Sequence, residues 1–346
     1  MAYTTIDKPS DYFNIVQYTG NAGTQAITGV GFSPNWVWGK ARNAAEGHAI
    51  HDTIRGVRKN VLANTTAAEE DIASITAFGS DGFTLGSNAH LNNNNSPTVA
   101  WCWKAETAFS NDASSTSIGS VDSVGTVNDT AGFSIVSWTG TGANATVKHG
   151  LSTAPSWILV KNRGAVENWV SFHTKLGNGL NQKLNNTEAN QDTTGSWNDT
   201  SPTTSVFSLG HFTNVNQSST AMIAYCFAEK QGYSKFGSYK GNGNANGTFV
   251  YTGFKPAWVL LKRSDATQAW ELRDNQRENP YNTQTGTFYV NEAGAEDNGE
   301  GIDMLANGFK CRASGGGQNA NAANYVYMAF AKNPFVTSTK IPATAR

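Results

Sequence analysis

The stretch Pro155-Ser156-Trp157-Ile158-Leu159-Val160-Lys161 occurs in three versions along the chain. The earlier version is Pro34-Asn35-Trp36-Val37-Trp38-Gly39-Lys40, and the later one is Pro256-Ala257-Trp258-Val259-Leu260-Leu261-Lys262. All three share a proline, then tryptophan two residues later, an apolar run and a lysine. Internal similarity at this spacing indicates tandem structural units.

Two further markers keep the same order around these stretches. An aromatic residue followed two positions later by glycine precedes each of them, as Tyr18-Thr19-Gly20, Trp138-Thr139-Gly140 and Tyr239-Lys240-Gly241. An apolar segment closes each copy, at 99–103, 223–227 and 326–330. We therefore predict three copies, at residues 12–104, 132–229 and 233–331, each the size of an ordinary domain.

The apolar runs within each copy are short, rich in Trp, Val, Ile and Tyr, and bounded by Gly, Asn, Pro and Ser, which is typical of strands. The 35 glycines of the 346-residue chain argue against an all-α protein. We predict an all-β fold of three tandem β-sandwich, jelly-roll-like repeats. Capping-box spacing at Thr66-Ala67-Ala68-Glu69 predicts one short helix.

The segments between the copies differ in length. Residues 105–131 are a Ser/Thr-rich linker or hairpin, whereas Lys230-Gln231-Gly232 is a tight connection. We therefore expect copies two and three to be docked rigidly, with copy one at a different angle. The polar N-terminal arm, 1–11, and the C-terminal tail, 332–346, have little apolar surface, so we expect them to contact neighbouring subunits in a homo-oligomer.

The repeated aromatic positions are candidates for the structural core of each copy. They are the tryptophans of the repeated stretch and the last residues of the closing segments, namely Trp36, Trp157, Trp258, Trp103, Phe227 and Phe330. The three cysteines are too few and too scattered for a disulfide framework. Cys102 and Cys226 hold equivalent positions, where a small apolar side chain suits a core.

Charge and hydropathy exclude two classes of partner. The 25 Lys+Arg and 26 Asp+Glu residues give a net charge of −1 and are scattered, so nucleic-acid binding is not expected. No apolar run is long enough for membrane insertion. The first residues lack a basic region followed by an apolar one, so no export signal is expected.

The sequence contains little that would indicate catalysis or metal binding. The chain has no G-x-S-x-G, P-loop or G-x-G-x-x-G motif, and we expect neither enzyme activity nor a cofactor. The cluster His48-Ala49-Ile50-His51-Asp52 is not repeated, which favours structural histidines over a metal site. The acidic segment 296–303 is expected to be a solvated loop, and its Asp297, Glu300 and Asp303 are the calcium candidates.

A binding site is expected where the repeat is broken. The segment Ser196-Trp197-Asn198-Asp199 has no counterpart in the other copies, so the shared fold does not require it. We predict an exposed Trp197 beside Asn198 and Asp199, a combination suited to glycan or protein surfaces.

Three stretches carry a resemblance to a known family. They are residues 2–7, residues 51–57 and residues 232–239 followed by 250–254. They resemble a family of repetitive virion proteins encoded by tailed phages of marine bacteria, including phages that infect cyanobacteria. The resemblance covers nearly the whole chain and brings no catalytic residues with it.

The resemblance implies a structural virion protein assembled in the cytoplasm of the bacterial host. A tail fibre or tail appendage that attaches to a host-surface glycan or protein is the leading interpretation, with other virion proteins and copies of itself as partners. Capsid decoration as a cement protein is the first alternative. A polysaccharide depolymerase is the alternative from another class.

Overall fold

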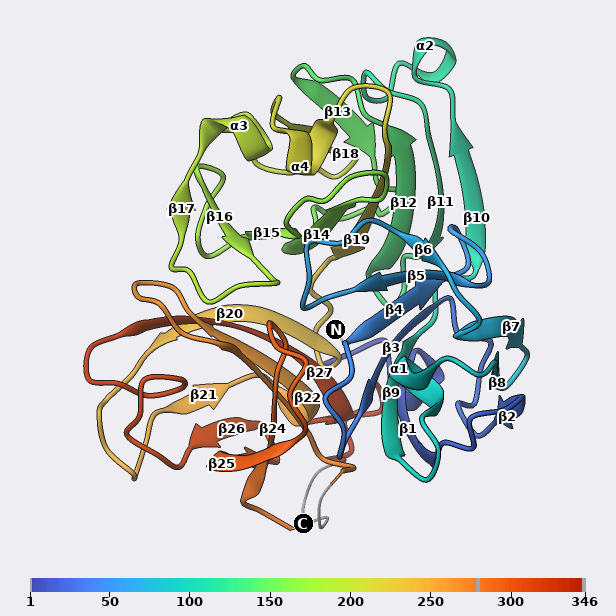
Figure 1. The fold of residues 1–346 in the computed structure, drawn as a ribbon. Helices are drawn as coiled ribbons and strands as arrows, with labels where there is room; N and C mark the ends of the chain where they lie inside the picture. The colour runs from blue at the N-terminus through green and yellow to red at the C-terminus, as the bar shows by residue number, and fades with distance from the viewer. Residues whose placement is uncertain (1, 278–280, 344–346) are drawn as a thin grey trace.

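The computed structural model describes residues 2–277 and 281–343, and its strands form antiparallel sheets (Figure 1). This architecture confirms the predicted all-β fold class. We refer to residues 12–104, 132–229 and 233–331 as units 1, 2 and 3. Residues Pro9–Asp11 form a 3-10 helix before unit 1.

Unit 1 consists of short strands and one single-turn helix, in the order β1 (Phe13–Thr19), β2 (Gln25–Ile27), β3 (Trp36–Ala41), β4 (Ala49–Asp52), β5 (Lys59–Leu62), β6 (Glu70–Asp71), β7 (Ile75–Gly79), β8 (Gly82–Leu85), α1 (Ala89–Asn92) and β9 (Pro97–Trp103). The segment 105–131 then forms a hairpin whose elements are β10 (Thr107–Asn111), α2 (Ala113–Thr116) and β11 (Ser123–Asn128). This hairpin extends the large sheet of unit 2 through the pairing of β11 with the first strand of that unit.

Unit 2 repeats the pattern in β12 (Phe133–Thr139), β13 (Ala145–Lys148), β14 (Trp157–Asn162), β15 (Val170–His173), β16 (Leu180–Lys183), β17 (Gln191–Asp192), α3 (Thr194–Trp197), β18 (Val206–Leu209), α4 (Thr213–Asn216) and β19 (Ala221–Phe227). Unit 3 contains β20 (Ser234–Lys240), β21 (Phe249–Tyr251), β22 (Phe254–Arg263), β23 (Trp270–Asp274), β24 (Gln284–Tyr289), β25 (Asp297–Leu305), β26 (Gly308–Cys311) and β27 (Asn324–Pro334).

The large sheets of the units share one strand order. It reads β1-β9-β3-β4-β5-β6 in unit 1, β12-β19-β14-β15-β16-β17 in unit 2 and β20-β27-β22-β23-β24-β25 in unit 3. The closing strand thus lies between the opening strand and the strand of the Pro-x-Trp stretch. The register is also shared, and it pairs Trp36 with Trp103, Trp157 with Phe227 and Trp258 with Phe330.

A second layer covers one face of each large sheet. It consists of β2-β8-β7 in unit 1 and β13-β18 in unit 2, and in unit 3 the sheet continues through β25 into β26 and β21. Apolar side chains fill the space between the layers, and Cys102 and Cys226 belong to these cores. Each unit is therefore a small sandwich with its own interior.

The opposite faces of the large sheets meet at the centre of the molecule. Successive strand residues point to opposite faces, so β3 sends Val37 into its own sandwich and Trp36 and Trp38 to the centre. Strand β14 divides in the same way, with Ile158 directed into unit 2 and Trp157 to the centre. Both faces are buried, which explains why these strands show no polar alternation.

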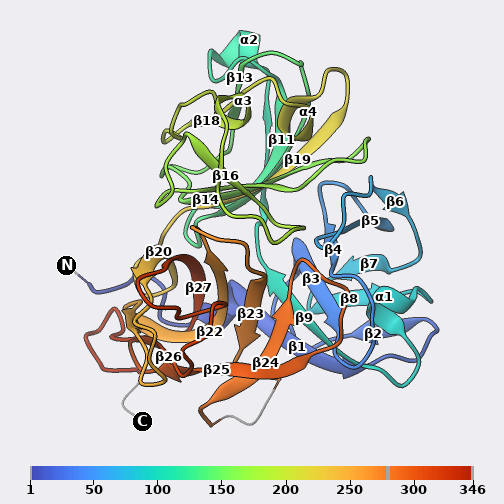
Figure 2. The same ribbon diagram turned by 60° about the vertical axis from the view of Figure 1, so that its left-hand side comes forward.

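The three units lie around a common centre (Figure 2), and the aromatic side chains of the central core join them there. The ring of Trp36 stacks on Tyr225 of unit 2 with 4.8 Å between centroids, and Trp38 meets Trp258 of unit 3 at 6.2 Å. The six predicted core residues, Trp36, Trp157, Trp258, Trp103, Phe227 and Phe330, are all buried here, between the units, and not inside each sandwich. Unit 1 supplies a third wall of this core, so it is docked against the other two units.

A buried asparagine holds the loop after the opening strand in each unit. Asn92, Asn216 and Asn319 are fully buried, and the Nδ2 of each donates to backbone carbonyls of that loop. The Oδ1 of each accepts a backbone N–H from the same loop.

The loops pass so close to the chain before the closing strand that they require the glycine of the aromatic-x-Gly marker. A Cβ on Gly20, Gly140 or Gly241 would lie 2.1–2.2 Å from a backbone carbonyl oxygen. The marker is therefore a requirement for space at this crossing.

Hydrogen bonds link the units in a closed cycle, between units 2 and 1, units 1 and 3, and units 3 and 2. We call these interfaces 2/1, 1/3 and 3/2. In interface 2/1 the Tyr225 hydroxyl donates to Asp52 over 2.6 Å, and Asp52 forms a fully buried ion pair with Arg55. At its edge, the Arg163 guanidinium donates to both oxygens of Glu69 over 2.9 Å.

Interface 1/3 repeats this arrangement with different side chains. The Trp101 indole donates to Asp274 over 2.9 Å, and Asp274 pairs with the buried Arg277 at 2.6 Å. Arg42 and Glu296 form the edge pair at 2.6 Å.

Interface 3/2 has neutral side chains at the same positions. Met328 replaces the polar donor, and His173 replaces the aspartate, with its Nε2 3.2 Å from the Tyr327 carbonyl. At the edge, the Asn190 N–H donates to the Ser264 carbonyl over 3.0 Å. Equivalent backbone bonds occur in the charged interfaces, so the backbone geometry is retained where the charges are not.

One expectation about local structure is wrong. Residues 66–69 are not helical, because this segment runs out to the neighbouring unit and the Glu69 N–H donates to the Arg163 carbonyl. The terminal arms contact their own chain, and their contact with neighbouring subunits stays a prediction. Tyr3 donates to the Gly253 carbonyl over 2.6 Å, Ile6 is buried in the central core, and Asp7 accepts the N–H of Ser338 over 2.6 Å. Residues 1 and 344–346 lie outside the described residues.

Candidate functional site

A hollow of about 400 Å³ opens on unit 3, and we call it the unit 3 pocket. Strands β23, β24 and β25 and the loop before β27 supply its walls, with Glu271, Tyr289, Glu300 and Gly316 among the lining residues. Small-molecule sites have volumes of about 300–1,000 Å³. The pocket is therefore large enough for a small ligand.

A buried ion pair lies behind the wall of this pocket, where Glu271 lines the hollow and Arg273 holds it from the protein interior. Arg273 is 1% exposed, and its Nη2 lies 2.8 Å from the Glu271 carboxylate and donates to the Glu300 carbonyl over 2.5 Å. Its Nε and Nη1 have no hydrogen-bond partner among the described residues. Unsatisfied buried donors are costly, and buried guanidinium groups normally have partners.

A glycine-rich strap, residues 315–317, closes over the carboxylates of the pocket. A Cβ on Gly315 would lie 1.8 Å from the Glu300 Oε1, and one on Gly317 would lie 1.6 Å from the Glu271 Oε1. Tyr325 holds the strap by donating its hydroxyl to the Gly316 carbonyl over 2.7 Å. A side chain on this strap would displace the carboxylates, and Glu271, which is held by Arg273, is less free to move than the exposed Glu300.

The buried charges are a feature of unit 3. The positions of Glu271 and Arg273 correspond to Val170 and Phe172 in unit 2, which lie in its apolar sandwich core. In unit 2 this space is closed by Trp197, whose ring meets Phe172 at 5.7 Å. The sandwich of unit 3 is polar where that of unit 2 is apolar.

Ionisable groups beside the pocket are held in their neutral forms. Burial, followed by the charges of Glu271 and Asp297, raises the pKa of Tyr289 to about 12. Burial also raises the pKa of Cys311 to about 11. Tyrosine hydroxyls that remain protonated at neutral pH can donate hydrogen bonds to a ligand.

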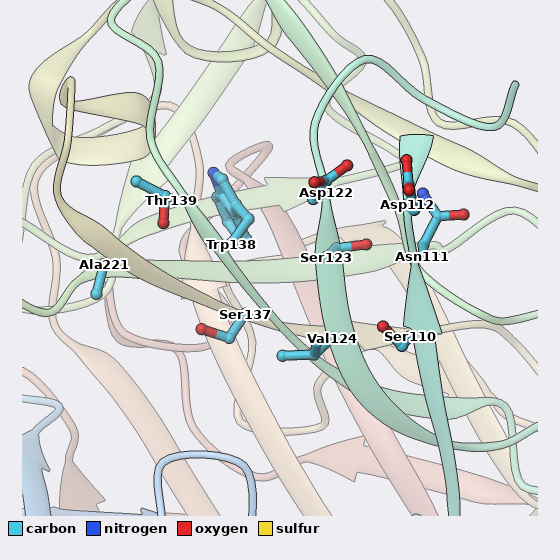
Figure 3. A pocket seen from close by; sticks show the side chains of 10 residues that line it. All are labelled: Ser110, Asn111, Asp112, Asp122, Ser123, Val124, Ser137, Trp138, Thr139 and Ala221. Atoms are coloured by element: carbon cyan, nitrogen blue, oxygen red, sulfur yellow. The ribbon is translucent and has the colours of Figure 1, made fainter. Parts of the chain in front are cut away.

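A second hollow, of about 320 Å³, lies beside the hairpin before unit 2. Figure 3 shows Asp112, Asp122 and Asn111 at one end of this hollow, and Thr139 and Ala221 at the other.

The acidic side chains of the second hollow already serve the turn. Asp112 accepts the N–H groups of Ser114 and Ser115 at the start of α2, and these bonds, with the Ser114 hydroxyl foremost, lower its pKa. Asp122 accepts the Ala113 N–H over 2.8 Å. These contacts give the carboxylates a structural role in the hairpin.

A fully buried lysine ends the Pro-x-Trp strand of each unit. Burial lowers the pKa of Lys40, Lys161 and Lys262 to about 8. Their ammonium groups donate to backbone carbonyls, for example from Lys161 to Thr66 over 2.9 Å and from Lys262 to Thr187 over 3.2 Å. Both bonds cross to the preceding unit, so Lys161 and Lys262 join neighbouring units, whereas Lys40 donates to Ala41 and Ala44 of its own unit.

The structure separates the predicted binding residues. Trp197 is 1% exposed and packs inside unit 2, so the expectation of an exposed ring is wrong. Helix α3 ends there and turns its indole inward, while Asn198 and Asp199 lie exposed in left-handed conformations just beyond it. The Asn198 side chain accepts a hydrogen bond from Asn144 over 2.6 Å.

The predicted calcium candidates lie on a strand and not in a loop. Asp297, Glu300 and Asp303 all belong to β25, and Asp303 is paired with Arg312 at 2.6 Å. In the described part of the chain, no three His, Cys, Asp or Glu side chains group closely enough to hold a metal ion. The histidine cluster is divided too, because His48 accepts from the Trp38 indole and Asp52 binds Arg55.

Sequence reasoning missed Glu271 and Arg273. A signal for them was present, because charged residues stand where the aligned copy has valine and phenylalanine. Charges at core positions of a strand are uncommon unless they are paired or serve a ligand.

No helix among residues 2–277 and 281–343 is long and apolar enough to cross a membrane.

Comparisons with known proteins give a match to one family model. No curated protein and no solved structure matches the chain. A single family model spans all three units, from residue 8 to residue 334. The chain therefore belongs to the DUF7483 family, described as a domain of unknown function.

Proposed function

We propose that this protein is a structural component of a phage virion, part of a tail fibre or tail appendage that attaches to the host surface. The observation that carries the proposal is the central core, in which the large sheets of three units share one aromatic interior. Such a core keeps the outward-facing parts of the units at constant positions. Attachment proteins use rigid scaffolds of this kind to present loops and pockets.

The interfaces add support for a rigid particle component. Buried side chains cross interfaces 2/1 and 1/3, and the terminal arms are pinned to unit 3. If a unit moved away from its neighbours, the packing and hydrogen bonds around the buried ion pair of Arg55 or Arg277 would be lost, which is costly for a buried charge. The resemblance to repetitive virion proteins of tailed phages points to the same role.

Localisation on intact particles tests the proposal. Antibodies raised against the purified chain should label the tails of virions in electron micrographs, and their Fab fragments should reduce adsorption to host cells. Labelling of the head would favour capsid decoration. Absence of the protein from purified virions would overturn the virion proposal.

A further inference from the structure

The unit 3 pocket combines hydrogen-bond donors and acceptors at close quarters. The acceptors are the carboxylates of Glu271 and Glu300, and Gln268 and Tyr289 add an amide and a hydroxyl. The Tyr289 hydroxyl also donates to the Asp297 carboxylate over 3.3 Å, and Arg273 lies behind Glu271. A ligand hydroxyl group both donates and accepts, so a ligand with several hydroxyls can satisfy both kinds of group.

The charge of the pocket restricts the ligand. Glu271 is balanced by Arg273, but Glu292 and Glu300 also line the pocket and are exposed. Lysine and arginine are absent from the described residues that line it. Phosphate, sulfate and carboxylate ligands would therefore be repelled.

A metal ion is not favoured either. Divalent cations in proteins are held by several oxygen ligands at short range. Among the described residues, no group of three acidic, histidine or cysteine side chains lies close enough to do so. A neutral ligand remains the best match to these walls.

The buried Arg273 fixes the position of Glu271 in the pocket wall. Its guanidinium is 1% exposed, lies 2.8 Å from the Glu271 carboxylate and donates to the Glu300 carbonyl, so it connects the two strands that carry the acidic side chains. A carboxylate that is held in one orientation by a buried partner is preorganised to accept hydrogen bonds from a ligand.

We propose that the unit 3 pocket binds a neutral, hydroxyl-rich ligand, one sugar residue of a surface polysaccharide, through Glu271, Tyr289 and Glu300, with Arg273 holding the Glu271 carboxylate from behind. The proposal rests on the proposed attachment function for its biological setting, whereas the binding chemistry rests on the pocket. A shallow site for one sugar binds weakly, and many copies on one particle raise the overall affinity.

Ligand-observed NMR on the purified full chain tests the binding. The probes are glucose, galactose, mannose and N-acetylglucosamine, each titrated to millimolar concentrations, with calcium chloride as a separate probe. We expect at least one sugar to bind with a millimolar dissociation constant. Glu300→Gln and Tyr289→Phe alter exposed or half-buried side chains, so they should keep the fold and weaken binding by about fivefold, a loss of roughly one hydrogen bond.

The control is Asp199→Asn, which changes an exposed carboxylate on unit 2 outside the pocket. Its binding should equal that of the wild type, and thermal melting should show that all variants are folded. The inference is overturned if none of these sugars binds, if the pocket variants bind normally, if Asp199→Asn weakens binding as much as they do, or if calcium binds and the sugars do not.

Two further measurements separate this inference from the proposed function. Tail labelling of virions together with an unaltered affinity in the pocket variants would retain the virion proposal and reject the pocket. Sugar binding by a protein that is absent from virions would retain the pocket proposal and reject the attachment role. Release of reducing ends from host polysaccharide, lost in Glu300→Gln, would show cleavage and overturn a purely binding pocket.

Discussion

Interfaces 2/1 and 1/3 contain a buried ion pair, whereas interface 3/2 has neutral side chains at the corresponding positions, although the three share the same backbone bonds. The charged interfaces place a polar aromatic donor opposite an aspartate and its arginine, as with Tyr225, Asp52 and Arg55. In interface 3/2 the corresponding residues are Met328, His173 and Leu176. Donor, acceptor and counter-ion have changed together, because a buried aspartate or arginine left without the others would be strongly destabilising.

The contacts common to all the interfaces indicate what the arrangement requires. The Trp169 indole donates to the Leu62 carbonyl, and the Trp270 indole donates to the Lys183 carbonyl, both over 2.9 Å. His48 takes the equivalent place in unit 1, beside the Tyr289 carbonyl. Hydrogen bonds to the backbone of the neighbouring unit thus occur in all the interfaces. The space beside them is filled by a buried ion pair in interfaces 2/1 and 1/3 and by neutral side chains in interface 3/2.

The largest effect is expected from breaking a buried pair in a charged interface. Asp274→Ala would leave Arg277 buried without its main partner and should lower the free energy of unfolding by about 3–5 kcal/mol. The matched change in the neutral interface, His173→Ala, removes no charged partner and should cost less. Chemical denaturation of both variants measures the difference, and equal losses would contradict the comparison.

Acid should weaken the neutral interface through His173. Burial lowers the pKa of His173 to about 4, against an unfolded value of about 6.5. Above pH 6.5 both states are neutral. As the pH falls toward 4, the unfolded chain takes up a proton that the folded chain does not, so stability falls by about 1.4 kcal/mol per pH unit, or about 3 kcal/mol in total.

Denaturation of the wild type and of variants between pH 7 and pH 4 gives the slope of the free energy of unfolding against pH. Variants are needed because other buried histidines also contribute to the slope of the wild type. His173→Gln should flatten the slope by one proton. His211→Gln, at an exposed position, is the control and should retain the slope of the wild type. Identical slopes in all three proteins would show that His173 is not held neutral.

Loss of one donor at a charged interface should have an intermediate effect. Tyr225→Phe removes the hydroxyl that donates to Asp52 and should cost about 1.5–3 kcal/mol, the range for hydrogen bonds to charged groups. Tyr233→Phe is a matched control, since the buried Tyr233 hydroxyl has no partner among the described residues. Thermal melting should show a loss for the first variant and none for the second.

The smallest effect is expected in the loop that follows the opening strand of each unit. Ala22 has φ +56° where the other units have Gly142 and Gly243, at +73° and +64°. Ala22→Gly should therefore relieve backbone strain and stabilise the protein by up to about 1 kcal/mol. Gly142→Ala should destabilise it, and melting temperatures that move in the opposite directions would refute this explanation.

The sequence predicted the strands and the repeat markers well. Pro-x-Trp stretches and closing segments were recognisable because both faces of these strands are apolar. The same property hid the central core, since burial of Trp36 is equally consistent with a core inside one unit or between units. Only the positions of the sheets distinguish the two.

The candidate site was largely beyond prediction. Trp197 broke the repeat and suggested an exposed platform, yet a turn of helix places its ring opposite Phe172. Glu271 and Arg273 come from adjacent positions on one face of a strand, but Glu300 and the glycine strap reach them from distant parts of the chain. A local sequence pattern cannot show that these distant segments come together in the fold.

The pinning of the arms to unit 3 has a topological consequence. Hydrogen bonds join Tyr3 to Gly253 and Asp7 to Ser338, so the beginning of unit 1 and the end of unit 3 lie next to each other. The interfaces also follow one another around a closed circle. A circularly permuted gene that starts at unit 2 and joins the old ends with a short linker should encode the same ring, since no interface depends on which unit the ribosome makes first.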